Sequence, residues 1–190
     1  MSEVGRRFFG MEDNPRLRVF DADARPYLRR TDERYDLIVA DAYHQPYVPF
    51  YLATREFFEL ARDRLTPGGI LALNVAAVPG DTSLLDGITG TLLHEFESVS
   101  VWPALRFNKI VLAFDRPVPR QELRQRLEDG PAELEPLRAL LARQLEPVTE
   151  KAERPWTDDR APVEWVTDRM IIEYAASGGE LDEDYLPTRP

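Results

Sequence analysis

Two aspartates, Asp23 and Asp41, closely follow short apolar runs at residues 17–20 and 35–40, and their type and spacing could serve chemistry. A carboxylate can accept a hydrogen bond from a ligand, or take a proton from it during a reaction. Two apolar runs separated by a helix-compatible segment are typical of a strand–helix–strand unit. Ligands of open α/β sheets bind at the carboxyl ends of the strands, so we expect both carboxylates to project into one crevice, a candidate active site.

The apolar pattern elsewhere predicts an α/β fold, with a mainly parallel sheet of about five strands and helices on both faces. Besides the two runs above, strands are predicted at residues 70–75, 98–102 and 108–114. Helices are predicted at residues 2–10, 25–31, 53–65, 81–96, 122–127 and 134–145. Thr54 is a plausible N-cap for the third of these helices.

Composition limits the classes of function. The chain has 190 residues, of which 43% are hydrophobic and 31% charged, which is enough for one domain with a sizeable core. Neither a membrane span nor the apolar core of a signal peptide is visible, so we expect a cytoplasmic protein. The net charge of −10 disfavours nucleic acid and anionic membranes as partners and is compatible with cationic substrates.

Several kinds of catalytic chemistry are absent from the sequence. The chain has no cysteine, which excludes disulfides, thiolate catalysis and cysteine-type zinc sites. Its two histidines, His44 and His94, are too far apart in sequence to suggest a local metal motif, and we expect no metal.

Several segments resemble motifs of the spermidine synthase family of polyamine aminopropyltransferases. They are Asp23-Ala24, residues 35–41 (YDLIVAD), residues 52–58 (LATREFF) and residues 65–71 (LTPGGIL). Each motif is weak alone, because many methyltransferases share it, but their order and spacing are more specific. The resemblance implies the doubly wound fold of S-adenosylmethionine-dependent methyltransferases. It also implies transfer of an aminopropyl group from decarboxylated S-adenosylmethionine, or a related S-adenosyl nucleotide, to a small-molecule amine.

The resemblance runs over residues 4–114, where residues 107–112 resemble the family's approach to an antiparallel edge strand. A second match, at residues 156–164 (WTDDRAPVE), resembles the closing motif of synthase-like domains that are fused to transporter-like membrane regions. We therefore expect a divergent branch of the family. The predicted domains are residues 1–116 (α/β), residues 117–176 (a helical extension packed on it) and residues 177–190 (an acidic, disordered tail).

The resemblance also implies roles for the two aspartates. At Asp23 the family's carboxylate accepts a hydrogen bond from the adenine amino group, and the backbone amide of Ala24 reaches a ring nitrogen. Asp23 could instead only cap the helix that follows it. Asp41 lies where the family has the base that orients the amine and takes its proton. The alternative for Asp41 is a strand-terminal aspartate that binds a loop amide.

The residues after Asp41 depart from the synthase pattern. The family has D-x-x-D-P, in which the second aspartate binds the far end of a diamine. This chain has D-A-Y-H-Q-P at residues 41–46, so His44 replaces the second aspartate and follows Tyr43. A neutral imidazole binds an ammonium poorly and a protonated one repels it, so the departure makes putrescine doubtful as acceptor. We predict that Tyr43 and His44 contact the substrate; the alternative for His44 is a surface-loop histidine.

The family's first two strands, with the glycine-rich turn and the acidic residue that hold the cofactor, have no counterpart before residue 4. We expect either a fragment of a longer protein or a truncated relative whose open sheet edge is covered in a homodimer. In either case we expect the chain alone to bind S-adenosyl nucleotides weakly, and without the glycine-rich turn it could be inactive by itself. Two other functions remain open: a methyltransferase-fold protein of other specificity, and a non-catalytic dimerising remnant.

Overall fold

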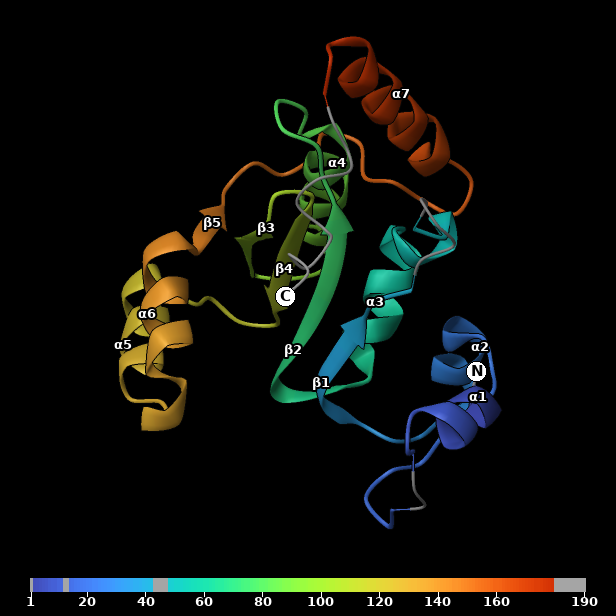
Figure 1. Ribbon diagram of the computed structural model, residues 1–190, viewed down its shortest axis with the longest axis vertical. Helices are drawn as coiled ribbons and strands as arrows, with labels where there is room; N and C mark the ends of the chain where they lie inside the picture. The colour runs from blue at the N-terminus through green and yellow to red at the C-terminus, as the bar shows by residue number, and fades with distance from the viewer. Residues whose placement is uncertain (1, 12–13, 43–47, 180–190) are drawn as a thin grey trace. The chain divides into compact units, whose positions relative to one another are not determined.

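The computed structural model describes residues 2–11, 14–42 and 48–179 (Figure 1). The chain divides into two compact units, Met1–Asp32 and Glu33–Pro190, which are described separately. The first unit contains α1 (Ser2–Phe8) and α2 (Ala24–Arg30). Gly10 has a φ of 65° two residues after α1, in the left-handed region that glycine adopts readily at the end of a helix.

The strand predicted at residues 17–20 is wrong, because these residues form neither strand nor helix. A strand needs a neighbour to satisfy its backbone N–H and C=O groups, and the described part of this unit contains no strand. The aromatic ring of Phe20 instead lies 4.9 Å from that of Tyr27 in α2. Local apolar character therefore predicted a strand that has no partner.

The second unit contains a sheet whose strands are ordered β1-β2-β4-β3-β5. Its strands are β1 (Tyr35–Ala40), β2 (Leu65–Ala76), β3 (Ser98–Leu105), β4 (Asn108–Phe114) and β5 (Glu146–Val148). The predicted α/β class is confirmed, but the expected mainly parallel pairing is wrong: β1 and β2 are parallel, and the other three pairs are antiparallel. The reason is that β4 runs against β2 and β3 and lies between them, although β1, β2 and β3 share one direction. β4 is therefore not the predicted edge strand.

One face of this sheet is covered by α3 (Arg55–Asp63) and α4 (Ser83–Leu92), which both contact β2 (Figure 1). Side chains alternate between the two faces of a strand, and the β2 side chains Leu71, Leu73 and Val75, which share this face, are buried. Phe57 and Phe58 of α3 are also buried. A third helix, α7 (Val163–Ala176), packs against α4.

The opposite face of the sheet is partly covered by the segment after β4. This segment contains α5 (Arg120–Glu128), η2 (Ala132–Leu134) and α6 (Glu135–Gln144), and Figure 1 shows α5 and α6 side by side. Trp102 of β3 donates a hydrogen bond from Nε1 to Gln144 Oε1 over 3.2 Å. Leu37 and Val39 of β1 are 54% and 61% exposed. Helices therefore accompany both faces, as predicted, and the β1 end of the second face is open among the described residues.

A loop near the C-terminus joins the first turn of α3 to α4. The backbone N–H of Arg55 donates to the Trp156 carbonyl (2.8 Å), and the Trp156 N–H donates to Thr91 Oγ1 (3.0 Å). A Cβ atom built on Gly87 of α4 would overlap the indole ring of Trp156. Glycine at this position lets the indole lie directly on the helix backbone.

Replacing Gly87 with alanine is expected to destabilise the protein, because the added methyl group and the indole of Trp156 cannot occupy the same space. Overpacking of this kind costs about 1–3 kcal/mol, and the higher helix propensity of alanine offsets at most about 1 kcal/mol of it. The measurement is the urea midpoint of unfolding. In a Trp156→Leu background the same substitution should cost less; an equal loss in both backgrounds would contradict the steric explanation.

Candidate functional site

The site is built around Asp41, which directly follows β1 and has an exposed side chain. Asn74 of β2 donates a hydrogen bond from Nδ2 to Asp41 Oδ1 over 3.1 Å. Asn108, at the start of β4, donates from Nδ2 to Asn74 Oδ1 over 2.9 Å. The two amides and the carboxylate therefore form a chain of hydrogen bonds that crosses three adjacent strands.

Strand register explains why these three side chains meet. Ala40 of β1 pairs with Leu73 of β2, so the residues that follow them, Asp41 and Asn74, lie on the same face of the sheet. Asn74 pairs with Ile110 of β4, which places Asn108 diagonally across from it on that face. The parallel pairing of β1 with β2 and the antiparallel pairing of β2 with β4 thus bring together residues far apart in sequence.

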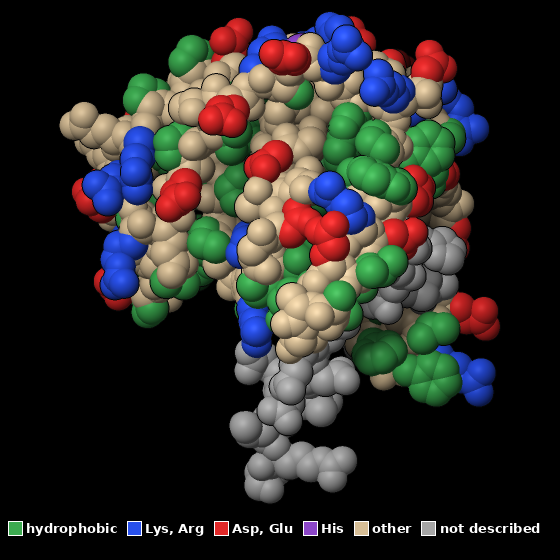
Figure 2. Space-filling view, turned by 90° about the horizontal axis from the view of Figure 1, so that it is seen from above, with side chains coloured by type: hydrophobic (Ala, Val, Ile, Leu, Met, Phe, Trp, Pro, Cys, Tyr) green, Lys and Arg blue, Asp and Glu red, His purple; other side chains and the backbone are tan. Residues whose placement is uncertain are grey.

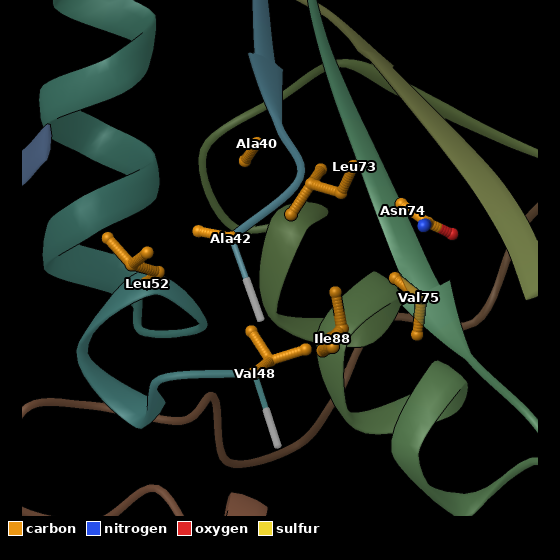
Figure 3. A pocket seen from close by; sticks show the side chains of 8 residues that line it. All are labelled: Ala40, Ala42, Val48, Leu52, Leu73, Asn74, Val75 and Ile88. Carbon is orange, nitrogen blue, oxygen red and sulfur yellow. The ribbon is translucent and has the colours of Figure 1, made fainter. Parts of the chain in front are cut away.

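A small pocket lies on the other side of β2, at the same end of the sheet. Figure 3 shows Leu73 pointing toward Ala42, Leu52 and Val48, whereas the amide of Asn74 points to the opposite side of the strand. Ile88 of α4 approaches from below. The free space inside is about 10 Å³, room for one water molecule at most, so it is a packed support under the site and not a ligand cavity.

The chain leads from this pocket through η1 (Phe50–Leu52) into α3. The predicted N-cap is confirmed: Thr54 Oγ1 accepts a hydrogen bond from the Phe57 N–H over 3.4 Å. The same hydroxyl donates to Asp158 Oδ1 over 2.7 Å, and the Asp158 N–H donates to Glu56 Oε2 over 3.0 Å. The segment at residues 156–158 thus fixes the start of α3, which gives part of the closing motif a structural role.

The other predicted site residues have different outcomes. Asp23 Oδ1 accepts a hydrogen bond from the Arg25 N–H over 3.0 Å, so its alternative role as the N-cap of α2 is confirmed. Ala24 is the first residue of that helix. Tyr43 and His44 lie outside the described residues. Asp23 and Asp41 belong to different units, and their shared crevice stays a prediction.

Sequence reasoning did not select Asn74 or Asn108 as part of the site. One signal was available, because Asn74 is the single polar residue in the otherwise apolar run 70–75. A polar side chain in such a strand needs a partner, and the partners come from two other strands. Which strands are adjacent could not be deduced from the local pattern.

Two titratable side chains near the ends of α4, Asp81 and His94, make contacts within the protein. The hydroxyl and backbone N–H of Ser83 hold the pKa of the Asp81 carboxyl below its ordinary value, and Arg169 of α7 lies 4.0 Å from the same carboxyl. Figure 2 shows acidic and basic side chains interspersed over the face seen from above. His94 Nε2 lies 2.8 Å from the Ala152 carbonyl, so this nitrogen carries the proton and the ring has a structural contact.

Two features are absent from the described part of the chain. Within residues 2–11, 14–42 and 48–179, histidine, aspartate and glutamate side chains do not gather in threes that could hold a metal ion. In the same residues, no helix is both long and apolar enough to cross a bilayer.

The chain is similar to known proteins both in sequence and in fold. No protein-family model matches the chain. It is 29% identical over 143 residues to a polyamine aminopropyltransferase of Vibrio vulnificus, an alignment that covers 72% of this chain and 46% of the relative. The chain therefore spans about half the length of that relative.

Solved structures that are similar to the chain include the following two. A probable spermidine synthase from Corynebacterium glutamicum has 20% identity and a TM-score of 0.59, and the match covers 100% of this chain and 62% of that one. Human methyltransferase-like protein 13, solved in complex with SAH, has 25% identity and a TM-score of 0.55, over 83% of this chain and 69% of that one. The first of these likenesses concerns the fold alone.

Proposed function

We propose, because this chain is a member of the spermidine synthase family, that it takes part in aminopropyl transfer to a small amine, with Asp41 as the general base. The observation that carries the proposal is the exposed Asp41 carboxylate at the carboxyl end of β1, which accepts a hydrogen bond from the Asn74 amide. In the spermidine synthase family, which the sequence resembles, the base occupies this position.

The chemistry asks little of the protein beyond proton transfer and orientation. The lone pair of the amine nitrogen attacks the aminopropyl carbon bonded to the sulfonium of decarboxylated S-adenosylmethionine. The carbon–sulfur bond breaks, its electron pair goes to sulfur, and methylthioadenosine leaves as a neutral thioether. The amine proton goes to a carboxylate oxygen of Asp41. An amine that is protonated in water needs such a base, and an exposed carboxylate can reach it.

Part of the proposed nucleotide site is provided by the start of α2. Asp23 there has the acceptor oxygens that an adenine amino group needs, and Ala24 has the backbone amide proposed to reach a ring nitrogen. A carboxylate can accept several hydrogen bonds, so the capping bond to Asp23 and adenine recognition are chemically compatible. We assign these two residues to the S-adenosyl nucleotide, and Tyr43 and His44 to the amine.

The test is a transfer assay on the purified chain. Decarboxylated S-adenosylmethionine, at about millimolar concentration because weak binding is expected of the chain alone, is incubated with putrescine, spermidine, agmatine and monoamines in parallel. Methylthioadenosine and the aminopropylated amine are measured by mass spectrometry. We expect equimolar formation of the two products with at least one amine. Methylthioadenosine formation that does not depend on the amine, or no product with any amine, would rule out the transfer.

A methyltransferase activity of the same fold is the second candidate. It is favoured by the likeness to human methyltransferase-like protein 13, whose structure contains SAH. The same assay with S-adenosylmethionine distinguishes the two, because methyl transfer releases S-adenosylhomocysteine and aminopropyl transfer releases methylthioadenosine.

A further inference from the structure

We propose that Asn74, anchored by Asn108, is a positioning residue that fixes the Asp41 carboxylate in the orientation that receives the amine proton. The inference rests on the proposed function for its catalytic consequence, while its geometric part concerns Asp41 alone. It is carried by the hydrogen bonds of 2.9 Å and 3.1 Å that connect the three side chains.

The order of the two bonds sets which end of the Asn74 amide faces Asp41. The Nδ2 group of Asn108 can only donate, so the end of Asn74 that faces it is the acceptor Oδ1. The donor Nδ2 of Asn74 then necessarily points the other way, toward Asp41 Oδ1. Asn108 thereby keeps the Asn74 amide from turning over, and an ionised carboxylate next to it always meets an N–H.

This arrangement matters because Asp41 follows the end of its strand and has an exposed side chain. An exposed carboxylate at such a place can adopt several rotamers. A hydrogen bond to a charged acceptor is roughly twice as strong as one between neutral groups, so a fixed donor selects one rotamer. With Oδ1 held by the amide, Oδ2 is the oxygen that meets the substrate amine in the proposed reaction.

The same pair of strands contains a matched hydrogen bond far from the site. Thr66 of β2 donates from Oγ1 to Asp36 Oδ1 of β1 over 2.7 Å, near the other end of the strands. Thr66→Val therefore removes a side-chain hydrogen bond between the same two strands without touching Asp41. It controls for general effects of weakening the contact between β1 and β2.

The chain has three asparagines, Asn14, Asn74 and Asn108, which makes the geometric test simple. Labelling the full chain with 15N-asparagine gives a separate side-chain amide signal for each. We expect Asp41→Ala and Asn108→Ala both to shift the Asn74 signal and to leave the Asn14 signal in place, whereas Thr66→Val leaves all three unchanged. An Asn74 signal that does not move in Asp41→Ala, or in Asn108→Ala, overturns the proposal.

The functional test uses Asn74→Asp, which keeps the shape of the side chain and replaces its N–H donor with a carboxylate oxygen that repels the Asp41 carboxylate. A misplaced reacting group can lower a rate by about 10²-fold, so we expect kcat to fall about 10- to 100-fold in Asn74→Asp, less in Asn108→Ala, and less than about 2-fold in Thr66→Val. KM for the amine and the melting temperature should change little. Unchanged kcat in Asn74→Asp overturns the positioning role. If the wild-type chain transfers nothing, the proposed function fails, and the labelling test alone decides whether the amides hold Asp41.

Discussion

Asp41→Asn is expected to lower the rate of aminopropyl transfer by about 10²–10⁴-fold, the range over which a positioned general base contributes. The asparagine oxygen can still accept the hydrogen bond from Asn74, so the local structure should be kept, but the side chain can no longer take a proton. The loss should appear in kcat measured with saturating amine. Binding of methylthioadenosine, measured by calorimetry, should stay within about 2-fold of the wild-type value, because neutralising Asp41 removes no contact assigned to the nucleotide.

Asp36→Asn is the matched control for this prediction. Asp36 lies on the same strand, is also exposed, and also accepts a hydrogen bond from a β2 side chain, Thr66. The two substitutions therefore make the same change in charge at opposite ends of β1. Equal losses of activity in both variants would point to the net charge of the strand and would remove the special role of Asp41.

Removing both arginines that hold Glu95 is expected to destabilise the second unit by about 1–3 kcal/mol. The Glu95 side chain is 4% exposed, and its two oxygens accept hydrogen bonds from Arg55 Nε (2.6 Å) and Arg62 Nη1 (2.7 Å). The bond to Glu95 raises the pKa of Arg55 above its ordinary value. In Arg55→Ala/Arg62→Ala the carboxylate loses both cations and the hydrogen bonds that they donate, and leaving this charge unpaired is unfavourable. Urea unfolding monitored by circular dichroism gives the difference in free energy.

Glu95→Gln should be much less harmful than the double arginine variant, although it changes the same cluster. It removes the buried charge itself, and the two arginines it leaves are 51% and 34% exposed and can be solvated by water. Glu59→Gln, at an exposed position of α3, should change stability by less than about 0.5 kcal/mol. A Glu95→Gln variant as unstable as the double variant would show that the hydrogen-bond geometry, and not the burial of charge, determines the effect.

Local patterns predicted the elements that bury one face. The helix predicted at residues 53–65 is observed as α3, capped by Thr54, and it buries Phe57, Phe58 and Ala61. The helix ends earlier than predicted, because Leu65 already pairs with Tyr35 in the sheet. Propensity located the helix, and the strand contact set its boundary.

Features that depend on distant partners could not be predicted. The run 17–20 has strand-like residues and no neighbouring strand among those described, whereas β5 is a three-residue strand whose sequence contains proline and which forms by pairing with β3. The position of β4 between β2 and β3 follows from the whole sheet and not from residues 108–114. The same holds for the candidate site. The position of Asp41 at the end of a strand could be predicted from the local sequence, but its hydrogen bonds with Asn74 and Asn108 could be predicted only with knowledge of the strand order.

The segment at residues 156–158, which contacts the start of α3, also constrains the order of folding. Thr54 and Arg55 form hydrogen bonds with Asp158 and Trp156, about a hundred residues later in the chain. Thr91 of α4 also accepts a hydrogen bond from Trp156. During synthesis, α3 and α4 therefore emerge from the ribosome well before the segment that completes their polar contacts. Contacts of such long sequence separation form late, after much chain entropy has been lost. We expect the nascent chain to stay protease-sensitive around residues 48–56 until Trp156 has left the exit tunnel, at which point the support beneath Asp41 becomes rigid.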